Sequence, residues 1–101
     1  MEQIYIIGDV HTVSAFRLSG ATGIVSGRQD AAKKLEDIIR KGDALIIAVT
    51  NDLADELQER ISAINITMPV PVVIAIPGLD DPRGFRRSVI SYISEALGIS
   101  L

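Results

Sequence analysis

The apolar run ALIIAV, Ala44–Val49, decides the fold of this chain. A strand with one face in water alternates apolar and polar residues, whereas this run contains no polar residue. Its length suits a strand and is far too short to cross a membrane. Continuous apolar strands are typical of parallel sheets that are covered by helices on both faces.

Three further segments have the character of strands. Ile4–Ile7 is a short apolar run that is closed by Gly8, and Thr22–Ser26 lies between glycines. Pro71–Gly78, PVVIAIPG, is a second buried strand, which opens with a proline. Because each run ends at residues that favour turns, the sequence predicts four short strands in all.

Helical patterns alternate with these strands. Residues 29–43, QDAAKKLEDIIRKGD, are amphipathic and end near Gly42, a residue that often terminates helices. The predicted apolar face of this helix consists of Ala32, Leu35, Ile38 and Ile39. A shorter helix is expected over Thr12–Ser19, with Thr12 as its N-cap.

Two more helices are expected after the central run. The first is capped by Asn51 or Asp52 and buries one stripe of residues, namely Leu53, Leu57, Ile61 and Ile64. The second runs from Phe85 to about Leu97. Its apolar residues span an arc of roughly 160°, wider than the ~100° that a core-facing helix needs. The excess indicates either a deeply buried helix or a second face for a partner.

This alternation of strands and helices with short connections predicts an α/β fold. We expect a four-stranded parallel sheet in the order 2-1-3-4 with helices on both faces, of the Rossmann-like or receiver-like kind. The predicted organisation is one domain, in which residues 1–78 form the sheet unit. Residues 79–101 add a loop and a C-terminal helix that is able to detach.

Composition argues against several functions. The chain has 101 residues, no cysteine and one histidine, so it offers no disulfide, no thiolate metal ligand and no zinc site. Its net charge is −3 and it lacks a basic stripe with aromatic residues, which argues against nucleic-acid binding. The N-terminus lacks the pattern of a signal peptide, so we expect a cytoplasmic protein.

A ligand site in such a sheet would lie at the carboxyl ends of the first and third strands. The residues that meet there are Gly8, Asp9, Thr50, Asn51 and Asp52. Asp9 could serve as a magnesium ligand or phosphoacceptor, as in receiver domains, or could cap a helix. Thr50 stands near the acceptor position, and no lysine follows Lys41, so capping is the favoured interpretation. No nucleotide-binding glycine motif and no catalytic set is found, and we expect no cofactor.

The segment AFRLSG, residues 15–20, has neither the usual pattern of a core helix nor that of a solvent-exposed surface. If Phe16 faces the sheet, Leu18 points away from it, and Arg17 lies between them. Arg17 could lay its aliphatic stem along the surface or belong to a contact patch for another protein.

Three blocks of sequence resemble the F subunits of V-type and archaeal A-type rotary ATPases. The first is GDVHTVSAFRLSG, residues 8–20, and the others are NDLADEL, residues 51–57, and PVPVVIAIPG, residues 69–78. In the first block the matching residues are Gly8, Asp9, Thr12, Val13, Phe16, Arg17, Leu18 and Gly20. Val10 and His11 depart from the usual pattern, as does the Ser19–Ala21 segment.

The resemblance implies a non-catalytic rotor subunit of the central stalk. Such a subunit binds the coiled-coil D subunit of the stalk and helps to couple ATP synthesis or hydrolysis to ion translocation. Its C-terminal helix is proposed to regulate the ATPase by reaching the catalytic A and B subunits. It would be peripheral at the inner face of the membrane, through the complex alone. The alternative is a degenerate receiver-like signalling or ligand-binding module.

Two sets of site residues follow from this interpretation. Gly8, Asp9, Thr12 and Gly20 are expected to form the structural motif at the first helix. The candidate partner-binding residues are Phe16, Arg17 and Leu18 in the opening block and Arg86, Ile90 and Leu97 on the last helix.

Overall fold

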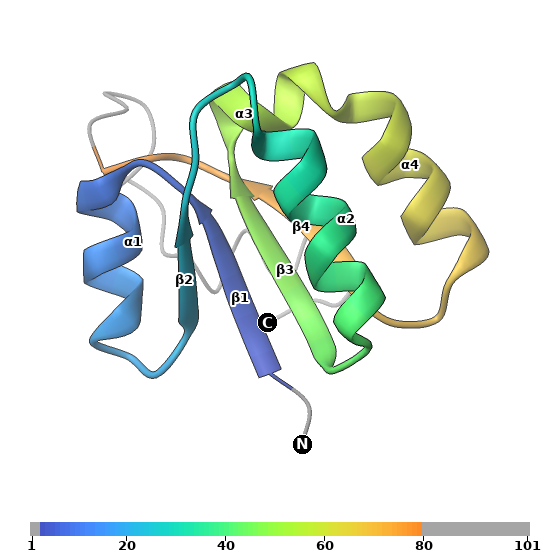
Figure 1. Cartoon of the computed structure of the whole chain (residues 1–101), viewed down its shortest axis with the longest axis horizontal. Helices are drawn as coiled ribbons and strands as arrows, with labels where there is room; N and C mark the ends of the chain where they lie inside the picture. Colours follow the sequence, from blue (N-terminus) through green and yellow to red (C-terminus); the bar gives the residue numbers. More distant parts are fainter. Residues whose placement is uncertain (1–2, 80–101) are drawn as a thin grey trace, which may run out of the picture.

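A computed structural model describes residues 3–79 of the chain. Four parallel strands form one sheet in the order β2-β1-β3-β4 (Figure 1). They are β1 (Gln3–Gly8), β2 (Thr22–Val25), β3 (Ala44–Thr50) and β4 (Val72–Ile76). The predicted fold class and strand order are therefore confirmed.

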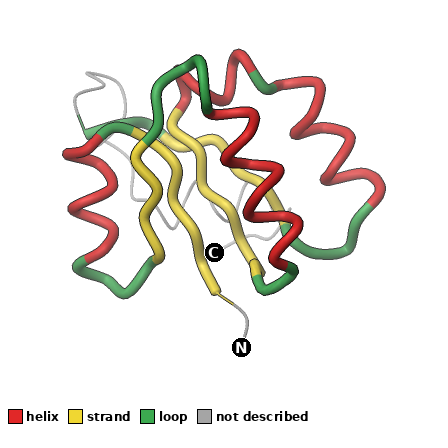
Figure 2. The backbone as a smooth tube through the Cα atoms, viewed as in Figure 1, coloured by secondary structure: helices red, strands yellow, loops and turns green. Residues whose placement is uncertain are grey.

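Four helices occupy the connections between the strands (Figure 2). They are α1 (Val10–Arg17), α2 (Ala31–Lys41), α3 (Asn51–Glu56) and α4 (Gln58–Thr67). Helix α1 packs on one face of the sheet, and α2, α3 and α4 pack on the other. The predicted helix over Phe85–Leu97, and with it the division at residue 79, lies outside the described residues.

The larger core lies between the sheet and helices α2, α3 and α4. Tyr5 and Ile7 of β1 and Ile47 and Val49 of β3 point into this core, because side chains two residues apart on a strand share a face. Its most deeply buried members are Tyr5, Ile7, Leu35, Ile47, Val49, Leu53, Ile64 and Val73. The second core lies on the α1 face and contains Ile6, Val13, Ala48, Ile74 and Ile76. The central run is thus buried from both sides along its carboxyl half, as predicted. Burial of the whole run was wrong, because Leu45 is 37% exposed and Ile46 is half-buried.

Helix α2 starts two residues later than the amphipathic pattern suggests, and its inward face is rotated. Ala31 is fully buried whereas Ala32 is exposed, so the prediction of Ala32 in the core was wrong. Ala31, Leu35 and Ile38 follow one another at spacings of four and three residues and form the buried stripe, whereas Ala32 lies at the side of that stripe. Gly42 ends the helix with a φ of 77°, as expected for a glycine at this position.

The segment after β3 consists of two helices rather than one. A turn at Leu57 separates α3 from α4, yet Leu53, Leu57 and Ile64 are all buried as predicted, with Ile61 half-buried. The expected cap at Asn51 or Asp52 was wrong, because α3 begins at Asn51 itself and Thr50 occupies the N-cap position. Thr50 makes no side-chain capping bond, since its side chain is directed into the protein.

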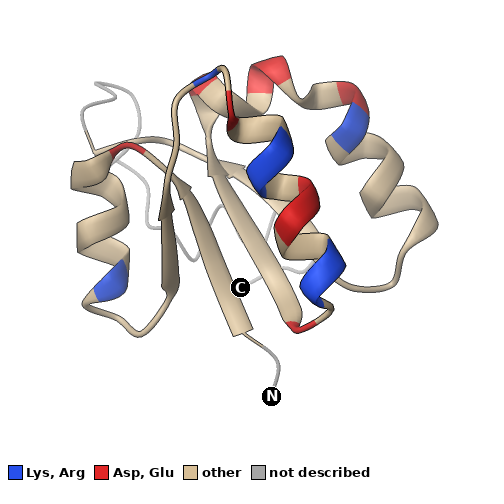
Figure 3. Ribbon diagram, in the orientation of Figure 1, with Lys and Arg blue, Asp and Glu red and all other residues tan. Residues whose placement is uncertain are grey.

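The outer edge of β4 is closed by a side chain from α4. The Asn65 amide nitrogen donates to the Val73 carbonyl at 2.9 Å, and the Val73 N–H donates to the Asn65 amide oxygen at 2.8 Å. An asparagine amide thus pairs with one residue of an edge strand as a neighbouring strand would. Charged residues lie on helices and connections and leave the four strands uncharged (Figure 3).

Candidate functional site

The carboxyl end of β1 leads directly into the N-terminus of α1. Asp9 is the N-cap, with extended backbone, and its carboxylate accepts from the Thr12 N–H at 2.9 Å and from the Thr12 hydroxyl at 2.8 Å. The prediction of Thr12 as the N-cap was therefore wrong, because the helix begins two residues earlier, at Val10. The Thr12 hydroxyl also accepts a hydrogen bond from the Leu79 N–H at 2.9 Å, which ties α1 to the segment after β4.

Two opposing effects act on the pKa of Asp9. Burial raises it, but hydrogen bonds from the Thr12 N–H and hydroxyl, together with the N–H groups of Asp9 and His11, outweigh that effect. The pKa of Asp9 is lowered, and the carboxylate is ionised at neutral pH. A carboxylate committed to these local donors stabilises the helix start.

The space beside Asp9 is filled by protein atoms. A Cβ added at Gly8 would lie 2.5 Å from Thr50 Cγ2, and a Cβ at Gly78 would lie 3.4 Å from Asp9 Oδ2. Gly8 is required here by the close approach of Thr50, whereas the sequence suggested a tight turn. The sheet end is thus packed, and no group of three potential metal ligands occurs within residues 3–79.

Thr50 lies at the place where a receiver domain would carry its acceptor aspartate. Thr50 is 1% exposed, and its hydroxyl oxygen has no hydrogen-bond partner among residues 3–79. Nothing in the sequence indicates this unpaired group, because it depends on how β1 and β3 approach each other. Asp52 is exposed in the first turn of α3 and does not join Asp9 in an acidic cluster.

The C-terminal end of α1 presents the predicted contact residues in three different environments. Phe16 is half-buried and packs on the second core, whereas Leu18 is 91% exposed. The Phe16 carbonyl accepts from the Ser19 N–H and hydroxyl and from the Ala21 N–H. Gly20, with a φ of 97°, allows the chain to turn back toward β2.

Arg17 has a structural role that the sequence did not reveal. Its Nη2 donates to the Gly23 carbonyl on edge strand β2 at 3.0 Å. A Cβ at residue 23 would collide with Val13 and with the Arg17 side chain, so this strand glycine permits α1 to pack closely. Lys34 of α2 similarly donates to the Val25 carbonyl at 2.6 Å. Two carbonyls of the β2 edge are thus occupied by basic side chains.

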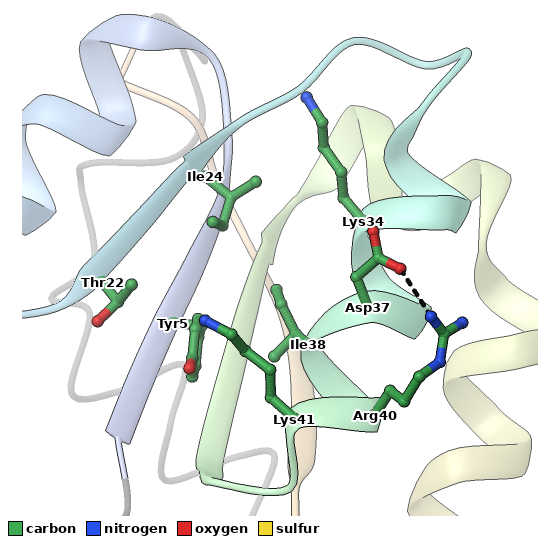
Figure 4. A pocket seen from close by; sticks show the side chains of 8 residues that line it. All are labelled: Tyr5, Thr22, Ile24, Lys34, Asp37, Ile38, Arg40 and Lys41. Carbon is green, nitrogen blue, oxygen red and sulfur yellow. Dashed lines mark hydrogen bonds and ion pairs between the residues drawn. The ribbon is translucent and has the colours of Figure 1, made fainter.

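A groove of about 410 Å³ lies on the opposite face, between β2 and α2 (Figure 4). Its floor is formed by Tyr5, Thr22, Ile24 and Ile38, and its rim by Lys34, Asp37, Arg40 and Lys41. Nothing in the sequence indicates this groove, because it forms where α2 covers β3 rather than β2, and that placement is a tertiary property.

Comparison with known proteins extends the resemblance to nearly the whole chain. The profile of the family described as ATP synthase (F/14-kDa) subunit matches residues 4–93. The chain belongs to this family. As a member of it, the chain is a non-catalytic F subunit of the V/A-type rotary ATPases, as the three blocks predicted.

The relatives named as F subunits are archaeal and bacterial. The chain is 35% identical over 101 residues to the A-type ATP synthase F subunit of Methanothermobacter thermautotrophicus, in an alignment that covers 97% of this chain and 94% of that protein. Identity to the A-type F subunit of Methanocaldococcus jannaschii is 24% over 98% of both chains. The V-type F subunit of Fusobacterium nucleatum is 36% identical over 76% of this chain and 72% of that protein.

Three predicted contact residues, Arg86, Ile90 and Leu97, lie outside the described residues. Within the described part, none of the helices is both long and apolar enough to cross a membrane.

Proposed function

We propose that this F subunit is a rotor component of the central stalk and binds the coiled-coil D subunit. It helps to couple ATP synthesis or hydrolysis to ion translocation, and it lies at the inner, cytoplasmic face of the membrane through the complex alone. The observation that carries the proposal is the full-length family match. The packed sheet end, where Asp9 is committed to Thr12, agrees with a binding subunit rather than a catalytic one.

The end of α1 is the proposed contact for the stalk. Leu18 offers a nearly fully exposed apolar side chain next to a helix end that is fixed by the bonds to the Phe16 carbonyl. Because the backbone there is already fixed, binding orders only the Leu18 side chain and loses little conformational entropy. Arg17 is the weaker candidate for direct contact, because its guanidinium already binds the Gly23 carbonyl. Arg86, Ile90 and Leu97 are proposed to contact the catalytic A and B subunits through the last helix.

The first experiment is a capture of the tagged chain from gently solubilised membranes of its own source. Recovery of a long helical subunit and two large nucleotide-binding subunits, identified by mass, is the expected result. Recovery of a histidine kinase instead would overturn the proposal in favour of the receiver-like alternative. Phosphorylation of the chain by a small phosphodonor with magnesium would also favour that alternative.

The contact itself is tested with Leu18→Asp. We expect weaker binding to the coiled-coil subunit by about tenfold or more, because a buried apolar anchor typically contributes above ~1.4 kcal/mol. Ile66→Asp is the matched control. Ile66 is a large apolar residue that is likewise mostly exposed, at 83%, but it lies on α4. Equal affinity of the Leu18→Asp variant and the unmodified chain would reject this contact.

A further inference from the structure

The groove between β2 and α2 is an unusual surface for a chain with a net charge of −3. Tyr5 and Ile38 in its floor are 1% and 3% exposed, so the floor is continuous with the main core. Ile24 and the Thr22 side chain, whose hydroxyl donates to Gln3, complete a wall on β2 that no helix of the described residues covers. Its volume of about 410 Å³ falls within the range of built binding sites.

The rim of this groove carries an excess of positive charge. Lys34, Arg40 and Lys41 line it against one acid, Asp37, which pairs with Arg40 at 3.3 Å. Lys34 pairs with Asp30 at 3.0 Å, whereas Lys41 has no ion pair among residues 3–79. Lys33, Asp30 and Asp43 do not line the groove but pair with Asp37, Lys34 and Tyr5, and with them the rim has four basic and three acidic groups. Charge complementarity therefore favours an acidic occupant.

The groove is unsuited to an added strand. An extended segment would have to pair with the outer edge of β2, but the Gly23 and Val25 carbonyls already accept from Arg17 and Lys34 at 3.0 and 2.6 Å. A helix satisfies its own backbone groups and can insert side chains into the groove without using that edge. An engineered apolar cavity of about 150 Å³ accommodates one benzene molecule, so a groove of about 410 Å³ has room for two or three large apolar side chains.

We infer that this groove, defined by Tyr5, Thr22, Ile24 and Ile38 with the rim residues Lys34, Arg40 and Lys41, binds an amphipathic helix of the coiled-coil stalk subunit. That helix inserts an apolar ridge into the floor and places acidic side chains against the basic rim. The inference rests on the proposed stalk function and adds a second contact, on the face opposite to α1.

The groove is tested first by photo-crosslinking in the assembled complex. A benzophenone amino acid replaces Thr22 in the groove wall, and the matched control carries it at Val25, which is 43% exposed on the same strand but does not line the groove. We expect Thr22 to cross-link to a helix of the stalk subunit, and Val25 to do so several-fold less. Cross-links from Thr22 to residues 80–101 of this chain, or to a second copy of it, would overturn the inference.

Binding to the purified coiled-coil subunit provides the second measurement. Lys41→Glu is expected to weaken binding by about tenfold and to reduce its dependence on salt, as loss of a complementary charge does. Arg28→Glu makes the same change outside the groove, and we expect affinity within about twofold of the unmodified chain. Thermal unfolding of both variants verifies that the fold is retained.

The two proposals fail in different ways. If the unmodified chain does not bind the coiled-coil subunit, the stalk function is wrong. If it binds but Lys41→Glu and Arg28→Glu have the same effect, the stalk function stands and the groove is not the contact.

Discussion

The carboxylate of Asp9 holds together two parts of the chain that are distant in sequence. It accepts two hydrogen bonds from Thr12, and the Thr12 hydroxyl in turn accepts from the Leu79 N–H. The same aspartate would be the obvious ligand residue in a receiver-like protein. Its position therefore shows how a residue of catalytic appearance can serve to cap a helix and fix a loop.

Asp9→Ala is expected to destabilise the fold by about 0.5–2 kcal/mol, as the loss of an N-cap does. Asp9→Asn is expected to cost less, because its amide oxygen can still accept from the Thr12 N–H. The amide nitrogen cannot replace the oxygen that accepts from the Thr12 hydroxyl. Urea unfolding of the two variants measures this order, and an Asp9→Asn variant less stable than Asp9→Ala would contradict the capping geometry.

The same interaction depends on pH. Because the pKa of Asp9 is lower in the folded chain than its ordinary value of 3.8, the folded state binds this proton less readily than the unfolded state does. Its stabilisation is present above pH 3.8 and is lost as the pH falls through the lower folded pKa. The free energy of unfolding, followed down to about pH 2, should fall less steeply in Asp9→Asn than in the unmodified chain.

Gly8 and Thr50 form a second residue-scale pair. A Cβ at residue 8 would lie 2.5 Å from Thr50 Cγ2 but 3.3 Å from its Oγ1. Gly8→Ala should therefore destabilise by about 1–3 kcal/mol through overpacking. Adding Thr50→Ser removes the Cγ2 methyl and should recover part of that loss. A double-mutant cycle measures the coupling, and strictly additive effects of the two changes would contradict the close contact.

At the scale of elements, the order of strands and helices was predictable because it depends on local patterns. Burial can be read directly from the apolar run at residues 44–49 and from the stripe on residues 53–64. The end of α2 can be read from the glycine that follows it. Helix starts were less predictable. Asp9 and Thr12 are both good capping residues, and only the backbone conformation decides which of them precedes the helix.

The predictions that were wrong depend on how the helices and strands pack against one another. Ala31 and Ala32 have the same chemistry, and the angle at which α2 lies on β3 selects which one is buried. The break at Leu57 preserves the predicted stripe, so the hydrophobic pattern alone cannot reveal it. Arg17, Lys34 and Asn65 reach strand edges across the fold, and nothing local in the sequence marks those contacts.

The contact between α4 and β4 gives an element-scale prediction. Asn65→Asp keeps an acceptor for the Val73 N–H but places an oxygen against the Val73 carbonyl, where the amide nitrogen now donates. We expect a loss of about 1–3 kcal/mol and faster hydrogen exchange of β4 amides. Asn51→Asp is the matched control, because an acid in the first turn of α3 is favourable. Similar melting temperatures for the two variants would contradict the role of Asn65.

For the molecule as a whole, side chains occupy backbone groups on both edges of the sheet. Arg17 and Lys34 bind carbonyls of β2, and Asn65 binds Val73 of β4. Open edges invite pairing with other chains, and these contacts oppose it. Partners are therefore expected to meet the chain through side chains, at the end of α1 and in the groove, rather than through sheet extension.

At alkaline pH, the stability of the whole fold depends on the phenolic proton of Tyr5. Its hydroxyl donates to Asp43 at 2.6 Å, and this hydrogen bond, together with burial and the Asp43 charge, raises the pKa of Tyr5 from 10.0 to about 12. The folded state thus holds the phenolic proton more tightly than the unfolded state does. The resulting stabilisation is complete below pH 10 and is lost as the pH rises toward about 12.

The chain contains two tyrosines, so Tyr92→Phe leaves Tyr5 as the only group seen in a tyrosine absorbance titration. We expect its midpoint to lie near 12 in the folded variant and near 10 in denaturant. Tyr5→Phe should remove the part of the alkaline loss of stability that this proton causes, because no phenol then bridges β1 to the turn before β3. If Tyr5 instead titrates near 10 in the folded chain, the phenol does not donate to Asp43, and the link from β1 to the turn before β3 consists of backbone bonds such as that from the Gln3 N–H to the Asp43 carbonyl.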